Sequence, residues 1–484
     1  MSDDPIENLL RSTASETRTA IRDADFGNVP PFKPNNNRAG AAAAGIVLLL
    51  IVGLGGWLLG SRPGDESNLE VAVPTEIEDG EPTEEPSLDP LPDEEGGEVE
   101  TATPEIPPVT DLQVREQQEL EAPAIGESFV DPAFGTTIVA ATDAASGEQI
   151  VPVQSPAAVW NADESLLLLY QTGGDVSRHI FVDASTFEIV GELPVVPSDI
   201  EDVFWHPTDP DLVVTTTGVD LVTVSASTGN VTTIASHPQC DSIDPGVATA
   251  GPSWDGSLIA LRCLSEGPLE LLSQPLAGGP AASLPIEDGE QGMASPDGQS
   301  IILEVDGGFE IYDTDLSERR SQIRWEASAP TVGVDGDGNP VIVSAGFQAD
   351  FPAVFAIAPI DGVGDEGAVE VIVGPDTGFP APRSGTRTSA SSWNALGVFA
   401  AASPLPVEVL EGGPFETFDG EVVVADLSTS PPTVRRVAHT RNTGQGPFGG
   451  AFVSISPSGR FVAFASDFGD DSSNTYIIDL ESGE

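Results

Sequence analysis

One short phrase returns along this chain and constrains its fold more than any other feature. "VWNADESLLLLY" begins at Val159, "SWDGSLIAL" at Ser253 and "SWNALGVFA" at Ser392. In each copy a polar turn is followed at once by a short hydrophobic run. The related turns are "WNADES" at Trp160, "HPTDPD" at His206, "SWDGS" at Ser253, "SPDGQ" at Ser295, "VDGDGNP" at Val334, "SWNALG" at Ser392 and "SPSGR" at Ser456.

The spacing of these turns predicts a repeated four-stranded unit. Neighbouring turns lie roughly 40 to 63 residues apart, inside the range for the four-stranded blades of a β-propeller with loop insertions. A second hydrophobic run follows each first one and ends in Asp, Ser, Thr or Gly, as in "HIFVDASTFE" and "TYIIDLESGE". Turn residues make the bends and β-branched residues fill the strands. We therefore predict an all-β, seven-bladed propeller over residues 127–484.

The ends of the repeat region predict how the ring closes. The last unit is one strand short when the chain ends after "TYIIDLESGE". The segment "FGTTIVAATD", residues 134–143, precedes the first unit and has no blade of its own. We expect it to supply the missing outer strand, which would leave no free sheet edge.

Three tryptophans stand beside these turns. We expect Trp160, Trp254 and Trp393 to occupy equivalent positions and to pack between neighbouring blades, where a large aromatic ring fills the wedge. The alternative is a row of tryptophans that stack on a ligand.

Two groups of motifs resemble known propeller families. "SPDGQSIILE" and "SPSGRFVAFASD" with "TYIIDLESG" are similar to TolB-type, WD-repeat-like repeats of bacterial envelope proteins. "DPAFGTTIVAATD" with "VWNADESLLLL" and "FWHPTDPDLV" resembles the opening of oligogalacturonate lyase and dipeptidyl-peptidase propellers. The resemblance covers residues 131–484. It implies the fold, and it implies little about function because propellers serve many functions.

An apolar segment near the N-terminus predicts a membrane anchor. Residues 41–60 carry no charge, and about 20 apolar residues span a bilayer core. Lys33 and Arg38 precede this segment, so the positive-inside rule places residues 1–40 in the cytoplasm and the propeller outside. About 40 residues precede the apolar run, which argues against a cleaved signal peptide. We predict a single-pass cell-membrane protein.

The composition of the region after the predicted span is typical of a linker. Residues 61–126 are rich in Pro, Glu and Asp, as in "PTEEPSLDPLPDEEGGEVE". Such a composition buries too little apolar surface to offset the entropy of ordering, so we predict a disordered, extended stalk. The tail before the span contains "IENLLRSTASETRTAIRDA", either a marginal helix or a docking helix for a cytoplasmic partner.

The net charge narrows the choice of partners. The chain has 78 acidic and 18 basic residues, for a net charge of −60. A surface of this sign repels phosphates, so nucleic acid is excluded as a partner of the propeller. The charge reflects either a halophilic or high-GC composition or a specific acidic binding surface.

The two cysteines, Cys240 and Cys263, are our only candidates for a covalent cross-link. Cys240 follows the strand "VTTIA", and Cys263 ends the strand "SLIALRC". An outer strand and the second strand of the next blade lie near enough for a disulfide, and an oxidising compartment would favour it. The other reading is two isolated thiols.

The sequence predicts no catalytic residue, no cofactor and no metal site. A Gly-x-Ser-x-Gly elbow is absent, as are nucleotide-binding fingerprints. "DGDGN" at Asp335 resembles a calcium loop only superficially, because it lacks the downstream glutamate. "DFGDD" at Asp467 is a loop between strands, and calcium binding by its carboxylates stays open as an alternative. The four histidines fall in different repeats and lack a ligand spacing. They are His179, His206, His237 and His439.

These observations favour a non-enzymatic binding scaffold or sensor for a protein or a glycan outside the membrane. Two alternatives stay open. One is an enzyme related to polysaccharide lyases or hydrolases, which convergence of the histidines and arginines at one channel mouth would favour. The other is a transmembrane signal relay that acts through residues 1–40.

Overall fold

The computed structural model describes most of the chain after residue 108. The described ranges are 109–153, 157–174, 176–246, 251–325, 327–346, 353–361, 369–381, 385–443 and 450–481. The predicted tail (1–40), the predicted span (41–60) and the linker up to residue 108 lie outside them. Within the described ranges, no helix combines the length and the apolar composition needed to cross a bilayer.

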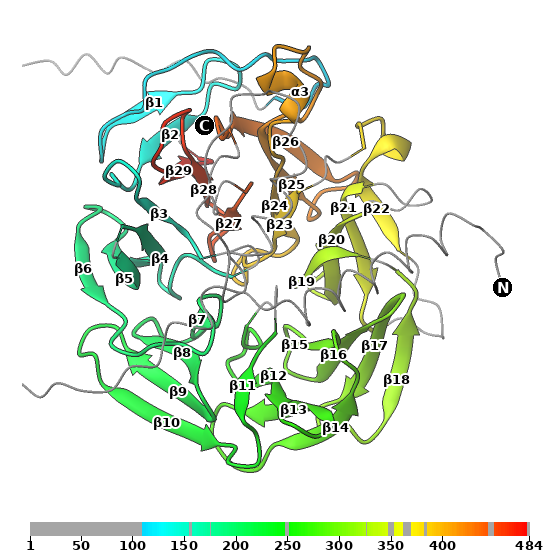
Figure 1. Cartoon of the computed structure of the whole chain (residues 1–484). Coiled ribbons are helices and arrows are strands. Elements are labelled where there is room, and N and C mark those ends of the chain that lie inside the picture. The colour runs from blue at the N-terminus through cyan, green and yellow to red at the C-terminus, as the bar shows by residue number, and fades with distance from the viewer. Residues whose placement is uncertain are drawn as a thin grey trace, which may run out of the picture. The chain divides into compact units, whose positions relative to one another are not determined.

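Seven antiparallel sheets are arranged in a ring as the blades of a propeller (Figure 1), and we call the region along the axis of this ring the channel. The all-β, seven-bladed prediction is therefore confirmed. The first three blades contain β3 (Gln149–Pro152), β4 (Leu166–Gly173), β5 (Val176–Asp183) and β6 (Ile189–Glu192); β7 (Val203–Trp205), β8 (Leu212–Thr217), β9 (Asp220–Ser225) and β10 (Val231–Ser236); and β11 (Ser242–Asp244), β12 (Leu258–Leu264), β13 (Leu269–Pro275) and β14 (Ala282–Ile286).

The remaining four blades follow in chain order. Blades four and five contain β15 (Gln291–Ala294), β16 (Ser300–Val305), β17 (Gly308–Asp313) and β18 (Arg319–Ile323); and β19 (Ser328–Val334), β20 (Pro340–Gly346), β21 (Ala353–Pro359) and β22 (Glu370–Val373). Blades six and seven contain β23 (Arg387–Ser389), β24 (Val398–Ala402), β25 (Glu421–Asp426) and β26 (Thr433–His439); and β27 (Val453–Ile455), β28 (Phe461–Ser466) and β29 (Asn474–Asp479) with β2 (Thr137–Ala140) and β1 (Ser128–Val130). Two short helices are η2 (Pro375–Thr377) and α3 (Val407–Leu410).

The recurring phrase is the turn that joins the first two strands of a blade. In the third blade, the Ser253 hydroxyl donates to the Asp255 carboxylate at 2.6 Å and accepts from the amide of Leu258 at 3.0 Å. The amide of Ser257 donates to the same carboxylate at 3.0 Å. Short polar side chains thus satisfy the turn's own backbone groups. Each blade needs one such turn, which explains why the phrase repeats.

Apolar side chains hold the blades together in pairs. Seven separate clusters of buried hydrophobic residues occur, and each is shared between two neighbouring blades. Between the first and second blades, for example, Leu168 and Phe181 pack with Val203 and Trp205. Each blade therefore buries both of its faces against its neighbours. The hydrophobic core consists of the interfaces between blades, arranged in a ring.

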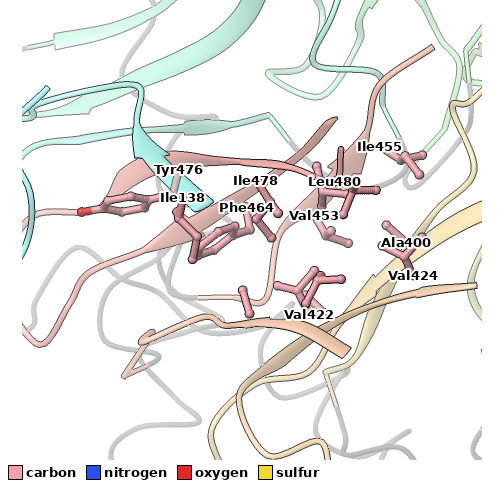
Figure 2. Close-up of a cluster of buried hydrophobic side chains, with 14 of the residues drawn as sticks. Ile138, Ala400, Val422, Val424, Val453, Ile455, Phe464, Tyr476, Ile478 and Leu480 are labelled. Carbon is pink, nitrogen blue, oxygen red and sulfur yellow. The ribbon is translucent and has the colours of Figure 1, made fainter. Parts of the chain in front are cut away.

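The ring closes through an N-terminal strand, as the sequence predicts. β2 pairs antiparallel with β29, and Ile138 lies opposite Ile478. Ile138 is fully buried and packs with Val453 and Phe464 in the cluster between the sixth and seventh blades (Figure 2). β1 then pairs with β2 and adds a fifth strand to this blade. The sequence analysis does not anticipate that fifth strand.

The linker prediction is wrong for residues 109–126, which we call the strap. Instead of being disordered, the strap is bound to the sixth blade. The amide of Arg436 donates to the carbonyl of Val109 at 2.9 Å, and the Thr417 hydroxyl donates to the carbonyl of Leu112 at 2.9 Å. Specific backbone hydrogen bonds supply the order that apolar burial does not.

The tryptophans divide into two groups, so the expectation of equivalent positions is wrong. Trp160 is buried between the seventh and first blades and stacks on Phe461, with ring centroids 6.2 Å apart. Its structural counterpart is Trp205, since each residue directly precedes the amide that closes its turn. In the third blade the amide of Ser253 closes the turn, so Trp254 stands two positions later than this slot. Trp254 and Trp393 lie inside their turns and line a small cavity there.

Cys240 and Cys263 form a disulfide in the structure. It links the segment after β10 to β12 in the next blade, with the Cα atoms 5.4 Å apart. It therefore connects the second and third blades beside the hydrophobic cluster that they share.

We expect unreduced, denatured protein to contain no free thiol. The bond closes a loop with a sequence separation of 23, which corresponds to about 3 kcal/mol of unfolding free energy in the chain-entropy model. The Cys240→Ser/Cys263→Ser protein should lose about that amount in urea unfolding. Two free thiols in the wild type, or equal stability of both proteins, would contradict the prediction.

Candidate functional site

The central channel has two chemically different ends. The innermost strands β3, β7, β11, β15, β19, β23 and β27 lie around the centre of the ring (Figure 1). The recurring turns follow the ends of these strands, so they define one end of the channel, which we call the turn end. The loops that enter the same strands define the other, which we call the entry end.

Aromatic side chains narrow the turn end. Trp254 and Trp393 line one small cavity together with Phe204 and Trp205. The cavity has a volume of about 20 Å³, which holds about one water molecule. A cavity of this size does not support the alternative of tryptophans that stack on a ligand.

The entry end carries carboxylates that the blades hold close to the channel axis. Asp202 directly precedes β7 and is 2% exposed. Its carboxylate accepts a hydrogen bond from the Thr216 hydroxyl at 3.1 Å. Asp244 ends β11, where its Oδ1 accepts from Arg262 Nε at 2.7 Å and from the amide of Gly246 at 2.9 Å. The second and third blades thus present acidic groups to one space.

Tight packing fixes the loop after Asp244. Gly246 has a φ of 88°, a conformation that side-chain-bearing residues rarely adopt. A Cβ atom on Gly246 would lie 3.0 Å from Cβ of Gln291 and 3.4 Å from Nε of Arg262. Gln291, at the start of β15, donates in turn to Glu304 at 2.7 Å. Gly246 is therefore packed closely between Arg262 and the fourth blade.

Burial and like charges shift the acidity of this site. Burial, and then the charge of Asp199, raise the pKa of Glu201 to about 7, against the opposing effect of Arg387 in the sixth blade. Burial, and then the charges of Asp244 and Asp199, raise the pKa of Asp202 to about 8. Two carboxyl groups thus exchange protons near neutral pH, a property that is concentrated at functional sites.

These shifts predict that the propeller loses stability as the pH rises from about 4 to about 8. The folded protein retains protons on Glu201 and Asp202 that the unfolded chain releases at its ordinary, lower pKa values, so unfolding becomes more favourable with rising pH. Each unit of pKa difference corresponds to about 1.4 kcal/mol. Asp202→Asn keeps the acceptor for Thr216 and should flatten this slope.

Urea unfolding of the wild type, Asp202→Asn and Asp241→Asn at pH 5 and pH 8.5 checks the prediction. Asp241 is exposed and serves as the control for removing one negative charge. Asp202→Asn should gain stability relative to the wild type only at the higher pH. If both variants gain the same stability at pH 8.5, the pH dependence of the unfolding free energy comes from general charge repulsion and not from Asp202.

The structure does not bring the four histidines together. His179 lies in β5 with Nε2 2.8 Å from the carbonyl oxygen of Ile200, and burial lowers its pKa. His206 accepts hydrogen bonds within its own turn, and His237 is buried after β10. His439 ends β26 with Nε2 2.8 Å from the carbonyl oxygen of Arg115. Among the described residues, no three His, Cys, Asp or Glu side chains are grouped to hold a metal ion.

The two acidic loops use their carboxylates to support their own backbone. Asp335 accepts from the amides of Asp337 and Asn339 at 2.9 and 2.8 Å. Asp467 accepts from the amide and hydroxyl of Thr443 at 2.9 and 2.6 Å. Both aspartates therefore have structural roles in turns.

Sequence reasoning missed the residues of the entry end. "SDIEDVFW", residues 198–205, places three acids just before an inner strand, and this run was the available signal. Inner strands converge on the channel, so acids at their first positions meet in space even when they are far apart in sequence. Asp244 and Arg262 carry no comparable signal, because only the pairing of β11 with β12 brings them together.

Comparisons with known proteins agree with the fold. No family model and no curated protein matches the sequence. Oligogalacturonate lyase from Vibrio parahaemolyticus is similar in structure, with a TM-score of 0.52 and 13% identity over 74% of this chain and 97% of that one. An oligogalacturonate lyase in complex with manganese has a TM-score of 0.52 and 15% identity, over 74% of this chain and 96% of that one. A putative TolB from Agrobacterium tumefaciens has a TM-score of 0.33 and 18% identity, over 44% of this chain and 79% of that one.

Proposed function

We propose that this protein is a membrane-anchored β-propeller, displayed outside the cell membrane, that binds a protein or a glycan without transforming it. The observation that carries the proposal is the entry end of the channel, where several blades supply carboxyl groups and arginines. Asp202 and Asp244 come from the second and third blades, and Arg387 from the sixth. A ligand at this end therefore contacts a rigid, mixed set of donors and acceptors.

The chemistry of this set favours a polar, uncharged ligand surface. Glu201 and Asp202 are partly protonated near neutral pH and can both donate and accept hydrogen bonds. Arg262 is held by Asp244, so its charge is already neutralised. Hydroxyl groups of a glycan, or amide groups of a protein loop, match such a mixture better than a strongly charged ligand does.

A photo-crosslinking amino acid at Asp199 tests the site. Asp199 is exposed in the loop that leads to β7. Asp297, exposed in a recurring turn, is the control at the turn end. In native membranes, the probe at position 199 should capture a defined partner or glycan and the probe at position 297 should not. Equal capture at both positions would refute the proposed site.

A second candidate function follows from the same carboxyl groups. A carboxyl with a pKa near 7 is suited to general acid–base catalysis, and the pKa of Glu201 is raised to about 7. This favours an enzyme acting on polysaccharide, and an oligogalacturonate lyase shares the fold. Turnover of an acidic polysaccharide by the wild type, lost in Glu201→Gln, would replace the non-enzymatic proposal. No turnover in either protein would support binding alone.

The proposed placement rests on residues 41–60 and the cations before them. Protease added to intact cells, or to spheroplasts if the envelope blocks access, should remove the propeller and leave a short membrane-bound stub. Protection of the propeller, or a mature N-terminus near Ser61, would contradict an uncleaved anchor with its C-terminus outside.

A further inference from the structure

Arg441 is a buried cation held between two aromatic rings. It follows β26 and is 3% exposed. Its guanidinium lies 5.4 Å from the ring centroid of Phe129 and 5.7 Å from that of Phe468. These contacts fix the plane of the guanidinium and keep water from its faces.

In the described structure, only Nη1 of this guanidinium donates hydrogen bonds. Nη1 donates to Asp131 Oδ2 at 2.9 Å and to the carbonyl of His439 at 3.1 Å. Nε and Nη2 are buried and have no hydrogen-bond partner among the residues that the structure describes. These two nitrogens form the edge whose parallel N–H groups bind both oxygens of a carboxylate. Leaving such donors buried and unpaired is costly, so the free edge indicates an absent partner.

Arg441 also lines a cleft of about 510 Å³. Strap residues 117–121 form one wall, and Thr443 and Gly469 contribute to the other. Gln117 Oε1 is also buried, and it has no hydrogen-bond partner among the described residues. Arg441 and Gln117 both line the cleft and thus bring it two donors and one acceptor, and no acidic side chain in the described part of the chain bonds to the arginine edge.

The strap wall can move without breaking a described hydrogen bond to the blades. Arg436 Nη1 holds the strap before the wall, through the carbonyls of Asp111 and Gln113 at 2.9 and 2.7 Å. The amide of Gly126 holds it afterwards, donating to the carbonyl of Ala140 at 2.8 Å. In the described structure no hydrogen bond joins residues 116–123 to a blade. A ligand can therefore reach Arg441 by displacing this stretch alone.

We propose that the cleft beside Arg441 binds a carboxylate that carries a neighbouring hydroxyl or amide N–H. The guanidinium edge receives the two carboxylate oxygens, and Gln117 Oε1 accepts from the neighbouring donor. A peptide C-terminus and a free hydroxy acid share this chemistry. The site lies against the sixth and seventh blades and does not depend on the proposed ligand at the entry end of the channel.

Equilibrium dialysis of the full-length protein with radiolabelled probes tests this proposal. The probes are N-acetyl-alanyl-alanine and L-lactate, each paired with its own amide. At least one acid should bind and its amide should bind at least tenfold more weakly. Binding of the dipeptide alone indicates a peptide C-terminus, and binding of lactate indicates a small acid. Failure of both acids, or equal binding of acid and amide, overturns the proposal.

Two variants locate the bound acid. Arg441→Lys retains a cation beside Asp131 but lacks the forked edge, and it should weaken acid binding at least tenfold. Gln117→Leu lies in the stretch without hydrogen bonds to a blade, so it tests the site even if Arg441→Lys is unstable. It should weaken the preferred acid at least threefold. Unchanged binding in a folded Arg441→Lys protein, or in Gln117→Leu, contradicts the assignment.

Discussion

Deletion of residues 134–142 is expected to unfold the whole propeller rather than shorten one blade. The deletion removes β2, which pairs with β29 and closes the ring. It also removes Ile138, whose burial alone is worth about 2–5 kcal/mol by comparison with other large-to-small core substitutions. A typical domain has a total stability of about 5–15 kcal/mol, and the open ring would expose two unpaired sheet edges.

The measurement compares this deletion with an equal one in the linker. Thermal unfolding and size-exclusion chromatography should show loss of the cooperative transition and aggregation for the 134–142 deletion. Deletion of residues 90–98 should leave both unchanged. If the two deletions behave alike, the N-terminal strand does not close the ring.

Arg436→Met is expected to destabilise the protein by about 3–5 kcal/mol. Arg436 and Glu421 form a pair whose side chains are both 0% exposed. Two parallel hydrogen bonds join them, from Nε at 2.7 Å and from Nη2 at 2.6 Å. Removing the arginine leaves a buried carboxylate without its cation and also releases the strap, which Arg436 Nη1 binds. Glu421→Leu should cost a similar amount for the converse reason.

The double variant separates the charge effect from the strap effect. Arg436→Met/Glu421→Leu should recover much of the loss, because no uncompensated charge remains. Arg460→Met is the control, since Arg460 pairs with Asp479 at the surface with its side chain 43% exposed. That exposed pair should be worth less than about 1 kcal/mol. An Arg436→Met effect as small as the control effect, measured by urea unfolding, would show that the buried pair does not stabilise the fold.

The fold could be predicted because each blade carries its own local signal. In the turns at Ser253, Ser295 and Ser456, the hydroxyl of that serine accepts a hydrogen bond from the backbone amide five residues later. The repeat can therefore be recognised from the sequence. The closing strand was predictable by elimination, since the last unit lacks one strand. The position of Trp254 was misjudged by two residues, because the tryptophans were used to align the repeats, whereas the equivalent residues are Asn161 and Ser253, whose amides close the turns.

The site could not be predicted to the same extent because it depends on contacts between blades. Asp202 and Asp244 are brought together only by the convergence of inner strands, and the raised pKa of Asp202 comes from its burial and from the charges of Asp244 and Asp199. The strap was misread for a related reason. Its composition resembles the linker before it, whereas its order comes from hydrogen bonds to Arg436, Thr417 and His439 in the sixth blade.

Carboxyl footprinting tests most directly whether the entry end of the channel holds the ligand. Carbodiimide labelling with an amine, followed by mass spectrometry, is applied to the protein in native membranes and to the purified protein. Glu201 and Asp244 should be labelled less in membranes, because the bound ligand covers them. Asp163 and Asp297, exposed in turns at the other end, should be labelled equally in both samples. Equal labelling of Glu201 and Asp244 in the two samples, or protection at the turn end instead, would contradict the proposed binding site.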